Sequence, residues 1–191
     1  MKTVAPRFLV LFLPAISFGF APSAERPTDW WPAEVARALE SAGDNRAELV
    51  KVLRGAPTEQ RNGMAFLVAN MPERDLRTLR ADFLTENVAL AYRARNEMPW
   101  GKAVPEDLFL NDVLPYANVD ERRDDWRKEF FDLCLPLVKD CKTPSEAAQK
   151  LNTELFPKLK LKYSTERKAP NQSPHESIEQ GKAMVLRALR R

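Results

Sequence analysis

Few side chains in this sequence have the chemical types that nucleophilic or acid–base catalysis needs. The 191-residue chain has one histidine, His175, and two cysteines, Cys134 and Cys141. A thiolate attacks an amide far better than a thiol, so a catalytic cysteine needs a histidine or a helix N-terminus to lower its pKa. Cys134 instead lies beside Leu133 and three residues before Leu137, in an apolar helical pattern. This setting is typical of an inert, buried thiol.

The spacing of the two cysteines does not favour a disulfide. On one unbroken helix, Cys134 and Cys141 would be separated by about 10.5 Å along the axis, at about 1.5 Å per residue. A disulfide needs Cα atoms within about 7 Å. Pro136 could end the helix and bring the two closer, so a bridge stays open as an alternative. We favour two small buried hydrophobic side chains.

The remaining candidates for chemistry are acids, bases and one histidine near helix starts. The run 120–127 interleaves carboxylates and guanidinium groups, namely Asp120, Glu121, Arg122, Arg123, Asp124, Asp125 and Arg127. Such alternation indicates an ion-paired helix start more than an acid–base pair or a cation site. His175 follows Pro174 in "SPHE", which is typical of a capped helix start. We expect a solvated histidine there rather than a general base.

The elements that would position these residues are mostly helices. Helical periodicity covers residues 32–43, 44–56, 57–71, 80–98, 105–114 and 122–141. Asp44 is the expected cap of the second of these helices. "TPSE" predicts a further helix, with Thr143 as its cap, Pro144 in its first turn and Glu146 reaching back. "LKLKYS" at 159–164 alternates as a half-buried strand does, and Ser173 opens a last helix. The expected fold class is mainly α.

The N-terminus has the pattern of a secretory signal peptide. A basic opening precedes thirteen apolar residues at 8–20 and the small residues "APSA" at 21–24. We therefore expect a signal peptide over 1–24 and export to the periplasm or the outside. An uncleaved N-terminal anchor is the alternative. The formal net charge is +3, and removal of 1–24 takes away Lys2 and Arg7, leaving 28 basic against 27 acidic side chains. This balance does not favour nucleic acid as a partner.

Two stretches carry a resemblance to a known family. "VLPYANVDERRDDWR" at 113–127 and "KAPNQSPHESIEQGKA" at 168–183 resemble a bacterial, exported group of transglutaminase-like proteins. The similarity extends over residues 56–183. It implies a helical leader at 25–115, followed at 116–191 by the start of a papain-like α+β core with its first strand. In that core a cysteine begins a buried helix, and a histidine and an aspartate follow on adjoining strands.

The sequence departs from the family pattern at the expected nucleophile. After the glycine and alanine of its motif, the family continues with Ser-Cys-Thr-Gly, and Gly181 and Ala183 match the first part. Met184 then takes the place of the serine, and Val185 that of the nucleophilic cysteine. No histidine or aspartate follows. The resemblance therefore implies no catalytic residue in the chain as written.

Two functions remain as expectations. The first is a truncated transglutaminase-like protein, inactive as written, whose family chemistry would be thiol-mediated acyl transfer or hydrolysis at an amide. The second is a stand-alone, exported helical interaction module with a protein or peptide partner. We expect no cofactor, no metal site, and no membrane span after signal removal. Substrate and oligomeric state do not follow from the sequence.

Overall fold

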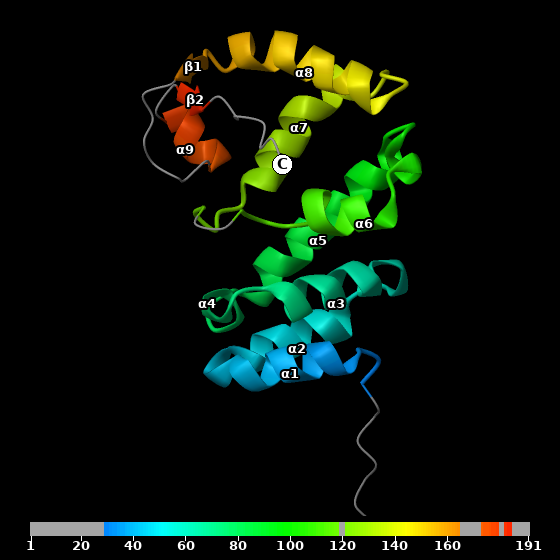
Figure 1. Cartoon of the computed structure of the whole chain (residues 1–191), viewed down its shortest axis with the longest axis vertical. Helices are drawn as coiled ribbons and strands as arrows, with labels where there is room; N and C mark the ends of the chain where they lie inside the picture. Colours follow the sequence, from blue (N-terminus) through cyan, green and yellow to red (C-terminus); the bar gives the residue numbers. More distant parts are fainter. Residues whose placement is uncertain (1–28, 119–120, 165–172, 180–181, 185–191) are drawn as a thin grey trace, which may run out of the picture. The chain divides into compact units, whose positions relative to one another are not determined.

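The computed structural model describes residues 29–118, 121–164, 173–179 and 182–184. Contacts divide the chain into two units, Met1–Trp30 and Trp31–Arg191. The predicted signal peptide at 1–24 and the position of Val185 lie outside the described residues. Everything below concerns the second unit, which is mainly helical, as predicted (Figure 1).

Nine α-helices follow one another through the described residues. They are α1 Ala33–Ser41, α2 Arg46–Gly55, α3 Arg61–Asn70, α4 Glu73–Leu76, α5 Ala81–Glu97, α6 Glu106–Leu108, α7 Trp126–Val138, α8 Pro144–Lys158 and α9 Pro174–Glu179. Three short 3₁₀ turns, η1 Gly43–Asn45, η2 Thr58–Gln60 and η3 Gly101–Ala103, and a π-turn, η4 Phe109–Val113, connect some of them. Two three-residue strands, β1 Lys162–Ser164 and β2 Lys182–Met184, complete the set.

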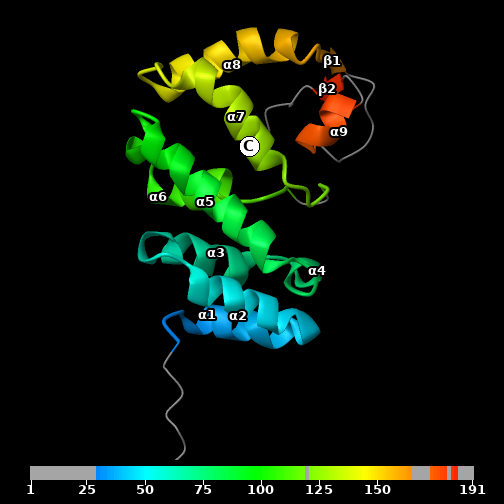
Figure 2. The ribbon, with the colours of Figure 1, turned by 180° about the vertical axis from the view of Figure 1, so that it is seen from behind.

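The 17-residue helix α5 is the centre of the fold. It packs on α2 and α3 on one side and on α7 on the other, and α8 packs in turn on α7 (Figures 1 and 2). Fully buried side chains of α5, Leu84, Val88 and Ala91, belong to the core that α1–α3 share. A second apolar cluster joins Met98, just after α5, to Val138 at the end of α7, Cys141 and Ala147 of α8.

The predicted helix caps hold where the capping residue and its partner are close in the sequence. At α8 the Glu146 amide donates to Thr143 Oγ1 at 3.2 Å, and the Glu146 carboxylate accepts from the Lys142 amide at 2.8 Å. The predicted Thr143 cap is confirmed, and Glu146 reaches back as predicted, although to the amide of the residue before the cap. The predicted Asp44 cap is wrong, because Asp44 lies inside η1 and the residue before α2 is Asn45. Asn45 Nδ2 instead donates to the carbonyls of Leu76 and Leu79, at 2.9 and 2.8 Å.

The strand is shorter than predicted, and it has a partner. Helix α8 runs on to Lys158, and Lys160 takes a left-handed φ of 55° before β1 begins at Lys162. The prediction of a strand from 159 was therefore wrong for its first half. β1 pairs in parallel with β2, with Lys162 opposite Lys182. The residues after α9 thus form a strand at 182–184.

Candidate functional site

The single histidine is held between two carboxylates. His175, on α9, places Nδ1 3.3 Å from Asp124 Oδ2 and Nε2 3.0 Å from Glu129 Oε2. Its side chain is 21% exposed, so the histidine is only partly solvated, where the sequence predicted a solvated one. A neutral imidazole carries one N–H, so only the doubly protonated ring donates to both carboxylates.

The Asp124 carboxylate accepts hydrogen bonds from two further side chains. Its Oδ2 also accepts from Ser173 Oγ at 3.1 Å and from Arg122 Nε at 2.9 Å. Serine, histidine and aspartate thus meet here, but the hydroxyl donates to the carboxylate and not to the imidazole. A serine nucleophile needs the imidazole to take its proton. The cluster therefore fastens α9 to the start of α7, and it lacks the geometry of a catalytic triad.

The arginines of the 120–127 run do not all pair locally. Arg122 binds Asp124, as the ion-paired helix start predicted. Arg123 reaches back to Asp75, which is 1% exposed, with Nε 3.0 Å from Oδ2. Tyr116 donates to the same oxygen at 2.8 Å. Burial and the adjacent carboxylate raise the pKa of Tyr116 well above its ordinary value. This buried triad joins α4 to the segment before α7.

Arg127 has no carboxylate partner within ion-pair distance among the described residues. Its Nε donates to Asn87 Oδ1 at 2.7 Å, and one Nη donates to backbone carbonyls at 113–115, the closest being that of Pro115 at 2.7 Å. The guanidinium stacks on Trp126, 4.7 Å from the ring centroid. Burial lowers the pKa of Arg127 to about 10, so it remains a cation at neutral pH.

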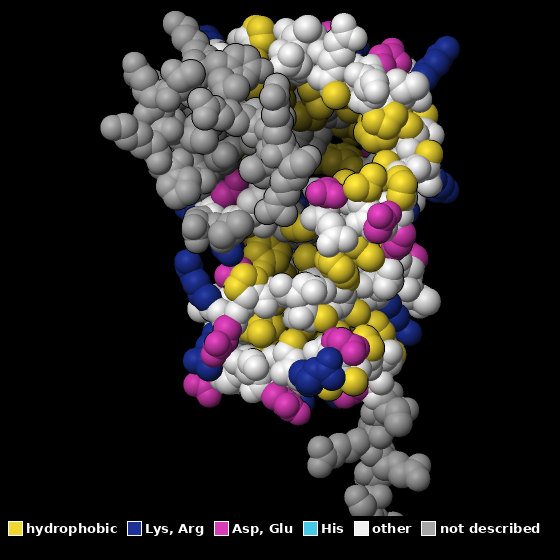
Figure 3. All heavy atoms as spheres, viewed as in Figure 1, with side chains coloured by type: hydrophobic (Ala, Val, Ile, Leu, Met, Phe, Trp, Pro, Cys, Tyr) yellow, Lys and Arg dark blue, Asp and Glu magenta, His cyan; other side chains and the backbone are white. Residues whose placement is uncertain are grey.

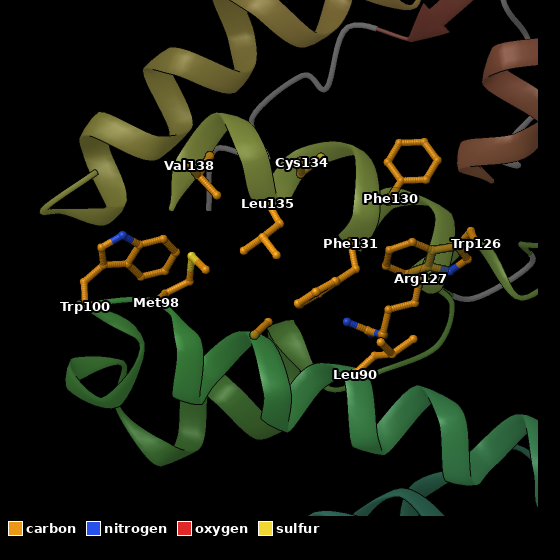
Figure 4. A pocket seen from close by; sticks show the side chains of 11 residues that line it. Leu90, Met98, Trp100, Trp126, Arg127, Phe130, Phe131, Cys134, Leu135 and Val138 are labelled. Carbon is orange, nitrogen blue, oxygen red and sulfur yellow. The ribbon is translucent and has the colours of Figure 1, made fainter. Parts of the chain in front are cut away.

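An apolar cavity of about 220 Å³ lies between α5 and α7, with Arg127 in its wall (Figure 4). Figure 3 shows a hollow in the surface between α6 and α8 with hydrophobic side chains inside it. The cavity is lined by Leu90, Ala94, Met98, Trp100, Trp126, Arg127, Phe130, Phe131, Cys134, Leu135 and Val138. Four of these side chains are aromatic, and only Arg127 carries a charge.

Neither Cys134 nor Cys141 forms a disulfide. Cys134 is half-buried in the cavity wall, and Cys141 is buried in the apolar cluster beside it. Burial raises the pKa of the Cys134 thiol, and the charge of Lys158 opposes this to a smaller extent. In the part of the chain that the structure describes, no hydrogen bond joins a thiol to the histidine. The preference for two cysteines without a bridge is thus confirmed, and the predicted burial holds for Cys141 but only in part for Cys134.

Sequence reasoning identified the residue types of this region but missed their partners. Asp75 and Asn87, which bind Arg123 and Arg127, received no attention because they lie 48 and 40 residues away. The cavity itself was also missed. One local signal could have indicated it: Arg127 stands inside an otherwise apolar helical face formed by Trp126, Phe130 and Cys134.

Two further observations concern the described residues alone. Across 29–118, 121–164, 173–179 and 182–184, no group of three or more His, Cys, Asp or Glu side chains is arranged to hold a metal ion. Within the same ranges, every helix is too short or too polar to cross a membrane.

Comparison with known proteins adds no relative. The chain matches no family model, no curated protein and no solved structure.

Proposed function

We propose that this chain is the helical leader and core start of an exported transglutaminase-like protein, inactive as written, and that its helical part has a binding role. The resemblance rests on the motifs at 113–127 and 168–183. Val185 stands where that family has its nucleophile. The mainly helical fold is compatible with a leader of this kind.

The state of Cys134 carries the proposal. This thiol is the more accessible of the two, yet burial raises its pKa and thereby disfavours the thiolate. The imidazole that would activate it is bound to Asp124 and Glu129. An enzyme of the transglutaminase-like class would need a cysteine with a lowered pKa and a histidine within hydrogen-bond distance of its thiol.

The test measures thiol reactivity and turnover together. Purified chain is treated with iodoacetamide at pH 7.5, natively and in 6 M guanidinium chloride, and is assayed for ammonia release from a glutamine peptide. We expect native labelling at least tenfold slower than labelling of the unfolded chain, and no ammonia. Rapid native labelling of one thiol, with ammonia release that Cys134→Ser abolishes, would refute the proposal.

The second candidate is a stand-alone helical interaction module, and the cavity between α5 and α7 favours it. A concave site lined mainly by apolar and aromatic side chains with one charged group is a common feature of binding sites, and an unfilled cavity is unfavourable for packing alone. This candidate requires that the chain folds without further material. A single cooperative thermal transition with a native near-ultraviolet dichroism spectrum is expected, whereas a molten, aggregating chain would argue against it.

A further inference from the structure

The cavity between α5 and α7 combines an apolar interior with one half-buried cation. Arg127 is the sole charged side chain among its lining residues. Figure 4 shows Arg127 beside Trp126 and Leu90, with its guanidinium end directed along the cavity. A charge that is partly withdrawn from water is stabilised by an opposite charge, because the loss of hydration is costly. Among the described residues, no carboxylate lies within ion-pair distance of Arg127.

Two of the three guanidinium nitrogens of Arg127 donate hydrogen bonds to the described residues. Nε binds Asn87, and Nη2 binds the carbonyls of residues 113, 114 and 115. All of these acceptors are neutral. Within the described part of the chain, Nη1 makes no hydrogen bond. Its two N–H groups, next to Nη2, belong to the planar fork with which arginine binds carboxylates.

The nearest acids do not take this role. Glu86, Asp124 and Asp125 line a second, smaller crevice together with Arg127, Asn87 and Leu90. Asp124 is already engaged by Arg122, Ser173 and His175. Glu86 and Asp125, like Asp124, form no ion pair with Arg127 in the described part of the chain, so its charge remains available to an anion that enters the cavity.

The volume and the lining of the cavity indicate what the apolar part of the ligand would be. An apolar cavity of about 150 Å³ is enough to hold benzene. The cavity here, at about 220 Å³, has room for one ring or a branched chain together with a carboxylate. Its aromatic walls, from Trp100, Trp126, Phe130 and Phe131, suit such a body. A folded peptide segment would need more space.

We propose that the cavity between α5 and α7 binds a small carboxylate with an aromatic or branched apolar body, whose carboxylate pairs with Arg127. This inference deepens the binding role proposed above and rests on it. It does not depend on the absence of turnover, so the ligand test and the ammonia assay fail independently.

The test compares an acid with its neutral isostere. 3-Phenylpropanoate and 3-phenylpropanamide are titrated into the full chain, and ¹H–¹⁵N spectra follow the indole signals of Trp100 and Trp126, assigned by Trp→Phe variants. We expect the acid to bind with a Kd of about 0.1–1 mM, as befits a ligand of this size. The amide should bind at least about tenfold more weakly, because it leaves Arg127 without a counter-ion.

Cavity variants keep the proposal testable if Arg127 itself cannot be replaced without unfolding. Ala94→Leu fills the cavity from α5 without removing a hydrogen bond and should abolish binding of the acid. Ala36→Leu makes the same change at an exposed position of α1 and should bind as the unaltered chain does. Arg127→Gln, where it folds, should equalise acid and amide.

Three results of these titrations would overturn the proposal. The acid and the amide could bind equally, the chain could show no shift of either indole signal at 10 mM acid, or Ala94→Leu could bind the acid as the unaltered chain does.

The salt dependence of binding distinguishes an ion pair inside the cavity from attraction to charges on the surface. The preference for the acid should change less than about twofold between 0.05 and 0.5 M NaCl, because buried pairs are screened little. A preference that disappears at 0.5 M NaCl counts against the site.

Discussion

Gly63 stands where α3 passes the ring of Tyr92 on α5. The Gly63 amide donates to Tyr92 Oη at 3.2 Å, and the ring is held edge-on against Phe109, with centroids 4.9 Å apart. A Cβ atom added at Gly63 would lie 2.8 Å from Tyr92 Cε2. Contact between the two helices therefore depends on the absence of one methyl group.

We expect Gly63→Ala to destabilise the fold by about 1–2 kcal/mol. Overpacking against a fixed ring costs about 1–3 kcal/mol, which exceeds the gain of up to about 1 kcal/mol in helix propensity. Urea unfolding at pH 7, followed by circular dichroism, measures the difference. Gly55→Ala is the control, since nothing lies within 4 Å of its added Cβ. That variant should be neutral or slightly stabilised, and equal effects at both sites would contradict this explanation.

Helix α8 is the element whose start the sequence specifies most completely. Thr143 accepts from the Glu146 amide, Pro144 occupies the first turn, and Glu146 accepts from the Lys142 amide. We expect Thr143→Ala to lower the free energy of unfolding by about 1 kcal/mol through loss of the cap. Urea unfolding provides the measurement.

The same substitution in the interior of α8 is the matched control for this cap. The Thr153 hydroxyl donates to carbonyls of its own helix, those of Gln149 and Lys150. Thr153→Ala should be neutral or stabilising by up to about 0.5 kcal/mol, because alanine has the higher helix propensity. A loss at Thr153 as large as that at Thr143 would show that the cap has no special role.

The elements that the sequence predicted well are those whose signals are local. The α8 cap involves residues at most four apart, and apolar periodicity indicated α1, α2, α3, α5 and α7. Some errors arose where contacts with residues far away in the sequence determine the role of a side chain. Asn45, rather than Asp44, comes before α2, and its side chain binds the end of α4, 31 and 34 residues away. The strand at 159–164 lost its first half because α8 continues through Lys158.

The candidate site was less predictable than the elements for the same reason. The 120–127 run shows alternating charges, which favours local pairs, and Arg122 with Asp124 is such a pair. Arg123 instead binds Asp75, and Arg127 binds Asn87. Neither Asp75 nor Asn87 belongs to a recognisable sequence motif. His175 likewise meets Glu129 across 46 residues. A cavity depends on all of these placements at once, and therefore no single stretch predicts it.

At the scale of the whole molecule, α5 connects the early helices to the later ones. It contacts α2 and α3 through its buried face and α7 through the side that lines the cavity. Polar links bridge the same division, since Asp75 of α4 binds Tyr116 and Arg123 ahead of α7. Loss of one such link should therefore be felt by the entire described fold.

The buried phenol of Tyr116 makes this dependence measurable by pH. Burial first, and then its hydrogen bond to the Asp75 carboxylate, raise its pKa above the ordinary value near 10. The folded chain therefore holds this proton more tightly than the unfolded chain. The resulting stabilisation is complete below about pH 10 and is lost as the pH rises further, by about 1.4 kcal/mol per pH unit for each such group. Burial also raises the pKa of Tyr92, which adds in the same direction.

We expect the free energy of unfolding to fall steeply above pH 10, with phenolate absorbance at 295 nm appearing together with loss of helix. Tyr116→Phe should be less stable at pH 8, because Asp75 loses a donor, yet its decline above pH 10 should be shallower by about one proton. Lysine and thiol titration is common to both chains and cancels in this comparison. Equal slopes, or a phenolate signal from Tyr116 in the folded chain, would mean that the triad with Asp75 and Arg123 does not hold this phenol protonated.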